Sequence, residues 1–522
     1  MFKSRYLIIC VLALSLFAQA FGADVSTYVH QLVQESDAAR LAALEKNVLE
    51  MGPSAEELVD ALKNAPLSPA SGTGIVRRKN LCIDGIERPY YLYIPTQYDH
   101  QTMTPLLVYL HGGVSREELA SDVEEFIEEL PFTELAEQRG YILLVPLGQY
   151  GATWWDSVGI ANVLQQIRNT KQEFNIDDDR VYMTGFSDGG SGSFLFAMCC
   201  PSYFAGFLPL NGHPGVGSEV GEIQTYFVNL YNRPVYVINT TDDRLYPAAE
   251  IFSMMELGHQ AQANVMYRIY AGIEHSFDYA DEEMPLMHTF MMTHPRSLPA
   301  SIQWETAYPD AGCDWLAVNE IQEQEEPAGW HEDHNMELTD DRVMFGFYPD
   351  YTYEGDGALV DRIAGDSTLC GLIGVQAGDV ITALDGSTIK DLDELNGYKQ
   401  GKQCGDSITL TIKRGDEELT LRGAFPGPFT YSLFTRGKPS AQIRGYYSGN
   451  TFSFETSRVA SFTVYIHPDM VRLDQPVTVR VNGKTVYNEL VEASPVYVLE
   501  NYLKHRDRAR LFVNKLPIIC SE

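Results

Sequence analysis

The sequence predicts an α/β fold in which a doubly wound, mostly parallel sheet forms the central part of a chain with several domains. Three observations lead to this prediction. The chain has 522 residues, which is more than a single domain usually contains. Between residues 75 and 299, short apolar runs with strand character alternate with helical stretches, the pattern of a sheet covered on both faces. After residue 300 the pattern changes, which indicates further domains.

The central region supplies strands and helices in alternation. Its strand-like runs are RPYYLYIP, PLLVYLHGG, GYILLVPLG, RVYMTGFSDGG, AGFLPLNG, RPVYVINT and VMYRIYAG. Helical stretches such as PFTELAEQRG and SVGIANVLQQIRNTKQEF lie between several of them. Parallel strands need crossover connections, which are usually helices, so this order favours a parallel sheet. Residues 75–299 are therefore predicted to form one α/β domain.

The N-terminus has the features of a secretory signal peptide. Lys3 and Arg5 precede the apolar run YLIICVLALSLF, and the small residues of AQAFGA offer a cleavage site near Ala23. The apolar run is too short to span a bilayer. We therefore expect residues 1–23 to be removed and the protein to be secreted or periplasmic, without a transmembrane segment.

Composition limits the partners of the mature chain. The formal net charge is −33, from 38 basic and 71 acidic residues, which argues against binding to nucleic acid or to anionic membrane surfaces. Of the eight cysteines, Cys10 lies in the signal peptide, and the remaining odd number leaves at least one thiol unpaired within the chain. No C-x-x-C pair is present, so we expect no structural zinc site.

One short motif points to chemistry. Gly185-Phe186-Ser187-Asp188-Gly189 has the form G-x-S-x-G and lies between a strand-like run and a helical run. A nucleophile elbow needs this form, because the backbone at the serine is strained and side chains on the flanking residues would strike neighbouring elements. Ser187 is therefore a candidate nucleophile.

The partners that such a serine needs follow in the required chain order. An acid should follow a later strand, and RPVYVINTTDDRLYP provides Asp242 and Asp243 there. A histidine should follow the last core strand, and VMYRIYAGIEHSFDY provides His275. An oxyanion hole needs the backbone N–H of Asp188 and a second N–H from a loop after an early strand, where YLHGG places Gly113.

Residues 75–298 resemble secreted α/β-hydrolase esterases related to polyhydroxybutyrate depolymerases and feruloyl esterases. The resemblance rests on YLHGG, GFSDGG, NTTDDRLYP and GIEHSFDY. In that family the acid lies four residues before a proline, so Pro247 selects Asp243 over Asp242. The resemblance implies an α/β-hydrolase fold and ester cleavage through an acyl-enzyme on Ser187, with neither cofactor nor metal.

Several aromatic and histidine residues are weaker candidates for substrate contact. Trp154 and Trp155 in TWWD could stack on a sugar or phenolic ring, although packing in the core explains them equally well. His213 in NGHPG is expected in a loop that could line the cleft. His331 and His334 in WHEDH lack the H-E-x-x-H spacing of a zinc site and are interpreted as part of a solvated polar loop.

The flanking regions are predicted to form three further parts. Residues 24–74 are expected to be a helical arm and a linker. Residues 338–425 resemble a PDZ domain of the bacterial protease type, through GVQAGDVITALDG and GDSITLTIKRG. The resemblance implies a possible peptide C-terminus or protein partner, with residues 344–350 as the carboxylate-binding loop. Residues 300–337 and 426–522 are expected to pair as one β domain, with the PDZ-like region as an insertion.

Two other functions remain open at this point. The same triad cleaves amides, so a serine peptidase of the prolyl-oligopeptidase type is an alternative. Such peptidases usually carry a large domain before the hydrolase, whereas only a helical arm precedes it here, which favours an esterase. A non-catalytic hydrolase-fold scaffold that acts through the PDZ-like domain is the third hypothesis, and the complete triad argues against it.

Overall fold

The computed structural model describes residues 24–67, 72–116 and 122–520, so the predicted signal peptide lies outside the described residues. The chain divides into two compact units. The smaller unit contains residues 335–433, and the larger unit contains the described residues on either side of it. Within the described residues, no helix is both long and apolar enough to cross a membrane.

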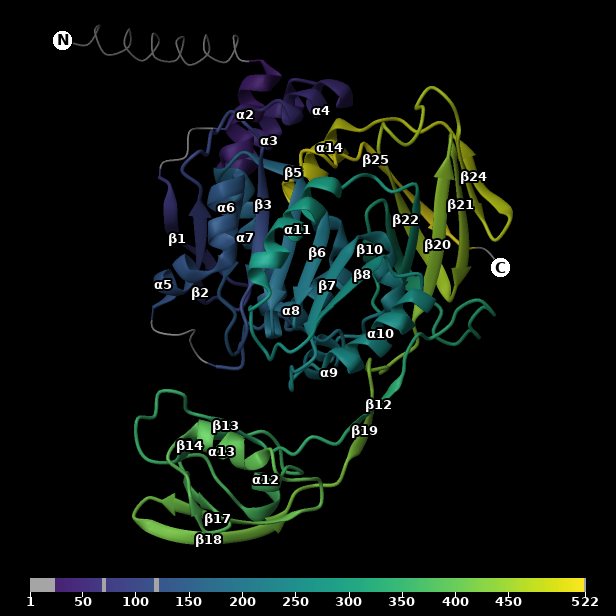
Figure 1. Ribbon diagram of the computed structural model, residues 1–522. Coiled ribbons are helices and arrows are strands. Elements are labelled where there is room, and N and C mark those ends of the chain that lie inside the picture. The colour runs from purple at the N-terminus through teal and green to yellow at the C-terminus, as the bar shows by residue number, and fades with distance from the viewer. Residues whose placement is uncertain (1–23, 68–71, 117–121, 521–522) are drawn as a thin grey trace, which may run out of the picture. The chain divides into compact units, whose positions relative to one another are not determined.

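The larger unit contains a sheet of eight strands in the order β1-β2-β4-β3-β5-β6-β7-β8 (Figure 1). Strand β2 runs antiparallel to both of its neighbours, and strands β3 to β8 run parallel to one another. The predicted fold class, an α/β-hydrolase sheet that is mostly parallel, is confirmed. The strands are β1 (Gly74–Leu81), β2 (Glu87–Ile94), β3 (Thr104–Leu110), β4 (Ile142–Pro146), β5 (Ile176–Phe186), β6 (Gly206–Leu210), β7 (Val235–Thr240) and β8 (Val265–Tyr270).

Helices cover both faces of this sheet. On one face, α5, α6 and α11 share a buried apolar cluster with Leu107 and Tyr109 of β3. Leu110 has the opposite parity in β3, and its side chain lies close to Gly192 of α8, so α8 covers the other face. The helices are α5 (Val123–Glu129), α6 (Pro131–Arg139), α7 (Ser157–Glu173), α8 (Asp188–Cys199), α9 (Val216–Gly221), α10 (Ala248–Gln260) and α11 (Ala280–Thr293), with short 3-10 turns at 201–203 and 227–232.

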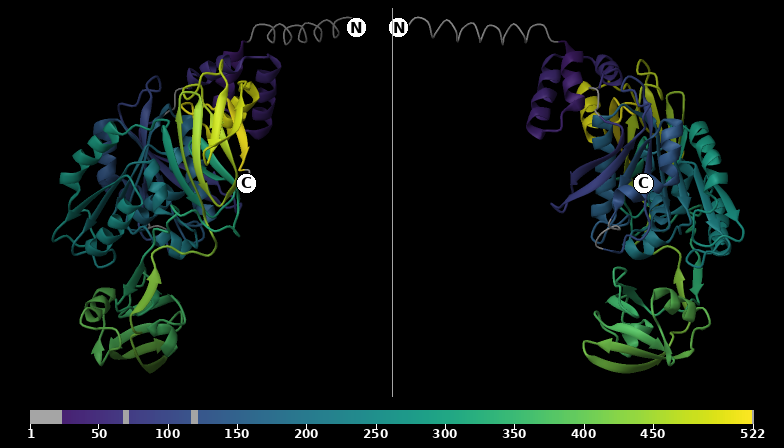
Figure 2. Two further views of the ribbon diagram at one scale, coloured as in Figure 1. Left: turned by 90° about the vertical axis from the view of Figure 1, so that its right-hand side faces the viewer. Right: turned by 60° about the vertical axis from the view of Figure 1, so that its left-hand side comes forward.

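A β-sandwich adjoins the hydrolase sheet within the same unit (Figure 2, left). One of its sheets has the order β10-β11-β22-β25 and the other the order β24-β23-β21-β20-β9. Phe454 and Phe462, one from each sheet, meet with ring centroids 4.6 Å apart. The strands are β9 (Ser301–Thr306), β10 (Ala311–Cys313), β11 (Leu316–Ile321), β20 (Ala441–Ser448), β21 (Thr451–Ser457), β22 (Val459–Ile466), β23 (Val477–Val481), β24 (Lys484–Glu489) and β25 (Asn514–Ile519).

The two ends of the described chain share the core of this sandwich. Strand β9 pairs with β20 and β11 pairs with β22, so strands from before and after residues 335–433 lie side by side in the same sheets. Apolar residues of the N-terminal helices belong to the same buried cluster as the sandwich strands and α14 (Figure 1). These helices are α2 (Val25–Gln34), α3 (Ala38–Glu50), α4 (Ala55–Lys63) and α14 (Pro495–His505).

Polar contacts fix the sandwich to the hydrolase sheet. The Asn229 side chain donates to the Glu305 carbonyl and accepts from the Glu305 N–H, so it extends the hydrogen bonding of β9. Asp314 is buried between Arg233 of the hydrolase part and Arg510 of the sandwich. A buried carboxylate is stable only when it is paired in this way. The hydrolase and sandwich parts are therefore joined by contacts that neither part satisfies alone.

The smaller unit has its own apolar core, formed by buried residues between Phe345 and Phe425. A two-stranded ribbon of β12 and β19 brings the two ends of this unit together, with Asp340 opposite Phe429. The elements are β12 (Glu337–Asp340), β13 (Phe347–Pro349), β14 (Ala358–Ile363), α12 (Leu369–Ile373), β15 (Val380–Leu384), β16 (Ser387–Thr388), α13 (Leu392–Lys399), β17 (Ser407–Arg414), β18 (Glu417–Ala424) and β19 (Phe429–Ser432).

Candidate active site

Ser187 lies on a sharp turn between β5 and α8. Its backbone has φ 59° and ψ −120°, a conformation that side-chain-bearing residues rarely adopt. The Ser187 N–H donates to the Leu210 carbonyl of β6 at 3.0 Å, which holds the turn against the sheet. Helix α8 begins at the next residue, Asp188. The serine is thus held in the strained geometry that a nucleophile elbow requires.

The two glycines of the motif are needed because neighbouring backbone is very close. A Cβ on Gly189 would lie 1.8 Å from the Leu110 carbonyl oxygen at the end of β3. A Cβ on Gly185 would lie 2.4 Å from the carbonyl group of Gly189. Both distances are far below van der Waals contact, so helix α8 can reach the sheet only with glycine at these positions.

We expect Gly189→Ala to prevent the elbow from forming. The added methyl group would push α8 away from β3, and overpacking against the backbone costs several kcal/mol. The variant should be insoluble, or should melt at least about 5 °C below the unmodified protein. Gly258→Ala in α10 is the matched control, because its Cβ would meet no atom closer than 3.6 Å. Equal melting temperatures for the Gly189 variant and the unmodified protein would contradict this interpretation.

Of the two candidate carboxylates, Asp243 contacts His275. The Asp243 Oδ2 lies 2.7 Å from the His275 Nδ1, and Asp243 is only 2% exposed. Asp242 is exposed, and its Oδ1 accepts from the Thr241 hydroxyl. With Asp243 accepting the Nδ1–H, the Nε2 of His275 keeps its lone pair and can act as a base.

A buried network holds the Asp243 carboxylate in place. Its Oδ2 accepts from the Asn211 side chain at 2.9 Å, and its Oδ1 accepts from the N–H groups of Leu245 and Tyr246. The Tyr279 hydroxyl in turn donates to the Asn211 Oδ1 at 2.8 Å, which fixes the orientation of that amide. Burial raises the pKa of Asp243, but hydrogen bonds from His275, Asn211 and Tyr246 outweigh it and hold the pKa below its usual range. The carboxylate therefore stays ionised.

His275 lies next to the elbow. Its ring is 4.7 Å from the ring of Phe186, the residue before the serine, measured between centroids. The ring of Tyr246 also neighbours the imidazole, with the two ring centroids 6.0 Å apart. Among the described residues, no hydrogen bond joins the Ser187 hydroxyl to His275. Catalytic hydrogen bonds of this type often tighten only when substrate binds.

The loop after β3 lies against the serine. A Cβ on Gly112 would meet the Ser187 Cβ at 3.0 Å, and Gly113 has φ +67°. His111 fixes the loop: its Nε2 accepts from the Gly148 N–H, so its Nδ1 carries the proton and donates to the Gly112 carbonyl. Burial lowers the pKa of His111 to about 4, so the ring is neutral and acts as a structural residue.

Asp188 connects this loop to helix α8. Its carboxylate accepts from the Val114 N–H at 3.0 Å and also interacts with the Gly113 N–H. Burial raises the pKa of the Asp188 carboxyl, and these N–H groups oppose that rise. If the Gly113 N–H donates a hydrogen bond to an oxyanion, the Asp188 carboxylate therefore competes with the oxyanion for that hydrogen. The Asp188 N–H lies in the first turn of α8, where backbone donors have no partner within the helix.

Trp154 and Trp155, the weaker candidates for substrate contact, are both buried, which favours the alternative of packing in the core. Trp154 is 1% exposed and packs beneath the loop after β3, where its Nε1–H donates to the His111 carbonyl. Trp155 is 5% exposed and lies against Gly221 of α9. Both indoles fill space beside glycines in the core. They therefore support the site from behind, since no ring face is open to a ligand.

His213, the third of the weaker candidates for substrate contact, lies near the candidate triad. Its ring is 5.9 Å from the Tyr246 ring, which also neighbours His275. The His213 Nδ1 accepts from the Gly215 N–H, and its Nε2 lies 3.5 Å from the Glu250 carboxylate. His213 is 5% exposed, so it forms part of the wall behind Tyr246.

Other sequence interpretations also change. His331 is not in a solvated loop: its side chain is 5% exposed and contacts Glu305 at 3.1 Å and Ser457 at 2.9 Å. The Asn211 amide, which donates to Asp243, is not among the residues predicted from the sequence. The only signal that could have identified it is its position directly after strand β6. All seven cysteines in the described part of the chain are free thiols.

Comparison with known proteins identifies relatives in sequence and solved structures that align with part of the chain. The chain is 29% identical over 167 residues to a bifunctional acetylxylan esterase/xylanase of Neocallimastix patriciarum, covering 31% of this chain and 22% of the relative. It is 24% identical over 135 residues to acetylxylan esterase A of Aspergillus oryzae, covering 24% of this chain and 41% of the relative. The chain thus spans less than half the length of these curated relatives. A solved structure of a thermostable esterase, with 20% identity and a TM-score of 0.35, covers 42% of this chain and 63% of its own.

The smaller unit is matched by a family description. Residues 371–422 match the PDZ domain family, which confirms the resemblance expected for this region. Together with the eight-stranded sheet and the similarity to esterases, this match describes both units of the protein. The chain therefore combines an α/β-hydrolase fold, similar in sequence to acetylxylan esterases, with a PDZ domain.

Proposed function

We propose that the protein is a secreted serine esterase that cleaves carboxylic esters through Ser187, His275 and Asp243. The observation that carries this proposal is the 2.7 Å contact between His275 and the buried Asp243, placed beside a serine with a positive φ. A serine hydroxyl is a weak nucleophile until a neighbouring base accepts its proton. The arrangement supplies that base and the carboxylate that orients it.

The proposed reaction has two halves. The His275 Nε2 accepts the Ser187 proton while the Ser187 oxygen attacks the ester carbonyl, and the resulting oxyanion receives hydrogen bonds from the Asp188 and Gly113 N–H groups. The C–O bond to the alcohol then breaks, and His275 returns its proton to the leaving alcohol. Water, deprotonated by His275, attacks the acyl-enzyme and releases the acid, which restores Ser187.

The relatives suggest the substrate class. The names of the matched proteins refer to acetylxylan esterases, which favours an acetyl ester on a polysaccharide. Export after cleavage near Ala23 would bring the enzyme to such a substrate outside the cytoplasm.

One purified sample can separate the esterase from the peptidase hypothesis. We expect release of acetate from acetylated xylan and of p-nitrophenol from p-nitrophenyl acetate, with no cleavage of peptide anilides. Hydrolysis of anilides without hydrolysis of either ester would overturn the proposed function.

We further propose that the PDZ domain binds a protein partner through a peptide C-terminus. Strand β13 lies at the edge of its sheet, so it offers unpaired backbone groups to an added strand. The preceding residue Gly346 has φ +82°, and a Cβ there would lie 2.0 Å from Thr368. The turn at the predicted carboxylate-binding loop, residues 344–350, is therefore held tightly against the start of α12.

Ester hydrolysis should not require the PDZ domain. Every candidate catalytic residue lies in the larger unit, and the smaller unit has a separate core. Because Asp340 and Phe429 are paired, residues 341–428 can be replaced by a short Gly/Ser turn that closes the β12–β19 ribbon as a hairpin. We expect the shortened protein to keep its rate on p-nitrophenyl acetate within about twofold, because no contact of Asp243, His275 or the elbow is removed. A folded protein without turnover would show that the PDZ domain shapes the active site.

A further inference from the structure

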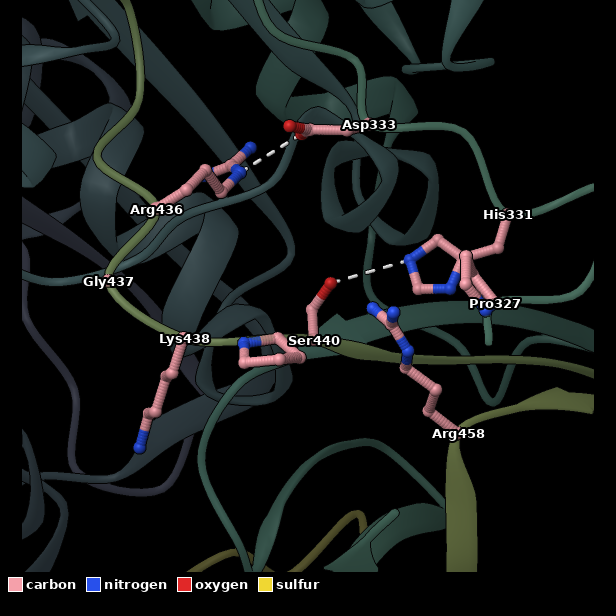
Figure 3. Close-up of a pocket in the computed structure, with 9 residues that line it drawn as sticks. Pro327, His331, Asp333, Arg436, Gly437, Lys438, Ser440 and Arg458 are labelled. Carbon is pink, nitrogen blue, oxygen red and sulfur yellow. Dashed lines mark hydrogen bonds and ion pairs between the residues drawn. The ribbon is translucent and has the colours of Figure 1, made fainter. Parts of the chain in front are cut away.

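A cavity of about 420 Å³ lies in the larger unit, away from Ser187 in sequence (Figure 3). The segment that carries Arg436, Lys438 and Ser440 forms one wall, and His331 and Arg458 face it from other segments. Asp333 is the only acidic residue among those that line the cavity. Three cationic side chains thus gather here in a chain whose net charge is −33. Such a local reversal of charge attracts anions.

Arg436 is held rigidly but keeps donors for a ligand. Its Nε donates to Asp333 at 3.0 Å, and its Nη1 donates to the Thr225 carbonyl at 2.9 Å. The guanidinium lies 4.5 Å above the ring of Tyr226, a cation–π contact that fixes its plane. Its Nη2 has no hydrogen-bond partner among the described residues. Little conformational entropy would therefore be lost when Arg436 binds a ligand.

Arg458 offers more free donors. Its Nε donates to the Glu325 carbonyl at 2.7 Å, whereas neither terminal nitrogen has a partner in the described part of the chain. Figure 3 shows its guanidinium extending toward Ser440 and the His331 ring. Its backbone has φ 56°, an uncommon conformation for arginine. The Lys438 side chain extends away from both guanidinium groups (Figure 3), with Nζ 4.5 Å from the Tyr308 ring and in no ion pair among the described residues.

A buried carboxylate, Glu305, lies behind His331 and Ser440, two residues that line the cavity. The Glu305 carboxylate is buried and contacts the His331 Nε2 at 3.1 Å and the Ser440 hydroxyl at 2.7 Å. On its other side, the His331 Nδ1 contacts Ser457 at 2.9 Å. Glu305 is thus occupied by polar partners and does not pair with Arg458. The terminal nitrogens of Arg458 remain available to an external anion.

The basic wall is fastened to the wall of the candidate active site. The Gln224 Oε1 accepts from the N–H groups of Gly437 and Lys438, and the Ser218 hydroxyl accepts from the Thr435 N–H. Ser218 and Gln224 belong to the segment that begins at His213, beside Tyr246. One continuous segment therefore connects the cavity with the surroundings of His275.

We propose that this cavity binds the carboxylate of an acidic sugar unit in the substrate. The proposal rests on the polysaccharide esterase function proposed above. The two free terminal nitrogens of Arg458 match a carboxylate, which accepts paired N–H groups, and the free Nη2 of Arg436 offers a further donor. The cavity is also large enough for a sugar ring around that carboxylate. Anchoring an acidic unit here would hold the polysaccharide on the enzyme while an ester on it reaches Ser187.

Calorimetric titration of the full chain carrying Ser187→Ala tests the binding step without turnover. The probes are D-glucuronate, D-glucose, which lacks the charge, and acetate, which lacks the ring. We expect glucuronate to bind at least about tenfold more tightly than either control, and the affinity to fall about tenfold or more in Arg458→Gln, because charge-assisted hydrogen bonds are lost. Lys438→Gln should weaken binding by less, because it removes a positive charge and no hydrogen bond to the carboxylate. Arg480→Gln, an exposed arginine on β23, is the matched control and should bind normally.

The outcomes separate this inference from the proposed function. Equal binding of glucuronate and glucose, or normal glucuronate binding by both pocket variants, would overturn the acidic-sugar site even if ester hydrolysis is intact. In the active enzyme, Arg458→Gln should lower kcat/KM on uronate-bearing acetylated xylan and leave p-nitrophenyl acetate hydrolysis unchanged. If no ester is hydrolysed at all, the proposed function fails, while the glucuronate titration still decides whether the cavity binds an acidic sugar.

Discussion

Ser187→Ala should lose about six orders of magnitude in kcat on p-nitrophenyl acetate while keeping its fold, because removal of a catalytic serine has an effect of that size in comparable triads. The side chain of Ser187 makes no described hydrogen bond that stabilises the turn, whereas its backbone N–H does, and alanine keeps that N–H. The check is the hydrolysis rate, with circular dichroism and thermal melting as measures of the fold.

A serine on the same helix provides the matched control. Ser193 is fully buried in α8, and its hydroxyl has no hydrogen-bond partner among the described residues. Ser193→Ala therefore removes a hydroxyl of the same kind without breaking a contact, and its activity should be normal. Substantial activity in Ser187→Ala, or equal losses in the two variants, would show that Ser187 is not the nucleophile.

Asp243→Asn should reduce the rate by about four orders of magnitude, the loss known for this change in a serine triad. The reason lies in the contacts of the two carboxylate oxygens. The N–H groups of Leu245 and Tyr246 donate to Oδ1, so the amide carbonyl of the variant must take that position. Its NH2 group then faces the His275 Nδ1 and donates to it, which leaves the proton on Nε2. The histidine would hold the wrong tautomer for a base.

Asp242→Asn tests whether the effect belongs to this one carboxylate. Asp242 is exposed and contacts Thr241 rather than His275, so its variant should lose less than about threefold, as surface substitutions usually do. The two rates are compared on the same ester at saturating concentration. A larger loss in Asp242→Asn than in Asp243→Asn would reverse the assignment of the acid.

Much of the fold could be predicted because its signals are local. The seven predicted strands of the central region correspond to β2 through β8, each of which carries a run of apolar residues. The elbow could be recognised because strain and close packing impose glycine on both sides of Ser187. The PDZ domain could be recognised from turn glycines and alternating strands within one short segment.

Strand β1 and the two tryptophans show where local signals fail. Only Asn80 is buried in β1, since this strand lies at the sheet edge and pairs only with β2. An apolar pattern is therefore absent. Trp154 and Trp155 lie just before a helix, and this position in the sequence is compatible with a place in a cleft or in the core. The space they occupy is created by distant glycines, Gly192 for Trp154 and Gly221 for Trp155.

The buried polar groups around Asp243 and Glu305 could not be predicted from the sequence for a similar reason. Asn211 meets Asp243, and Tyr279 meets Asn211, only because the sheet brings β6, β7 and the segment before α11 together. The His331 side chain is buried because strands from before and after the PDZ domain lie in one sheet. Its ring contacts Glu305 of β9 through one nitrogen and Ser457 of β21 through the other. These contacts depend on long-range pairing, and no spacing in the sequence encodes them.

The central claim is that Ser187 is an activated nucleophile, and peptide mapping of the full chain after reaction with a fluorophosphonate probe tests it most directly. We predict a single phosphonyl adduct on the peptide that contains Ser187, and a greatly reduced labelling rate when His275 is replaced by alanine, because the serine then lacks its base. An adduct on a different serine, or an unlabelled Ser187 in a preparation that hydrolyses p-nitrophenyl acetate, would contradict the claim.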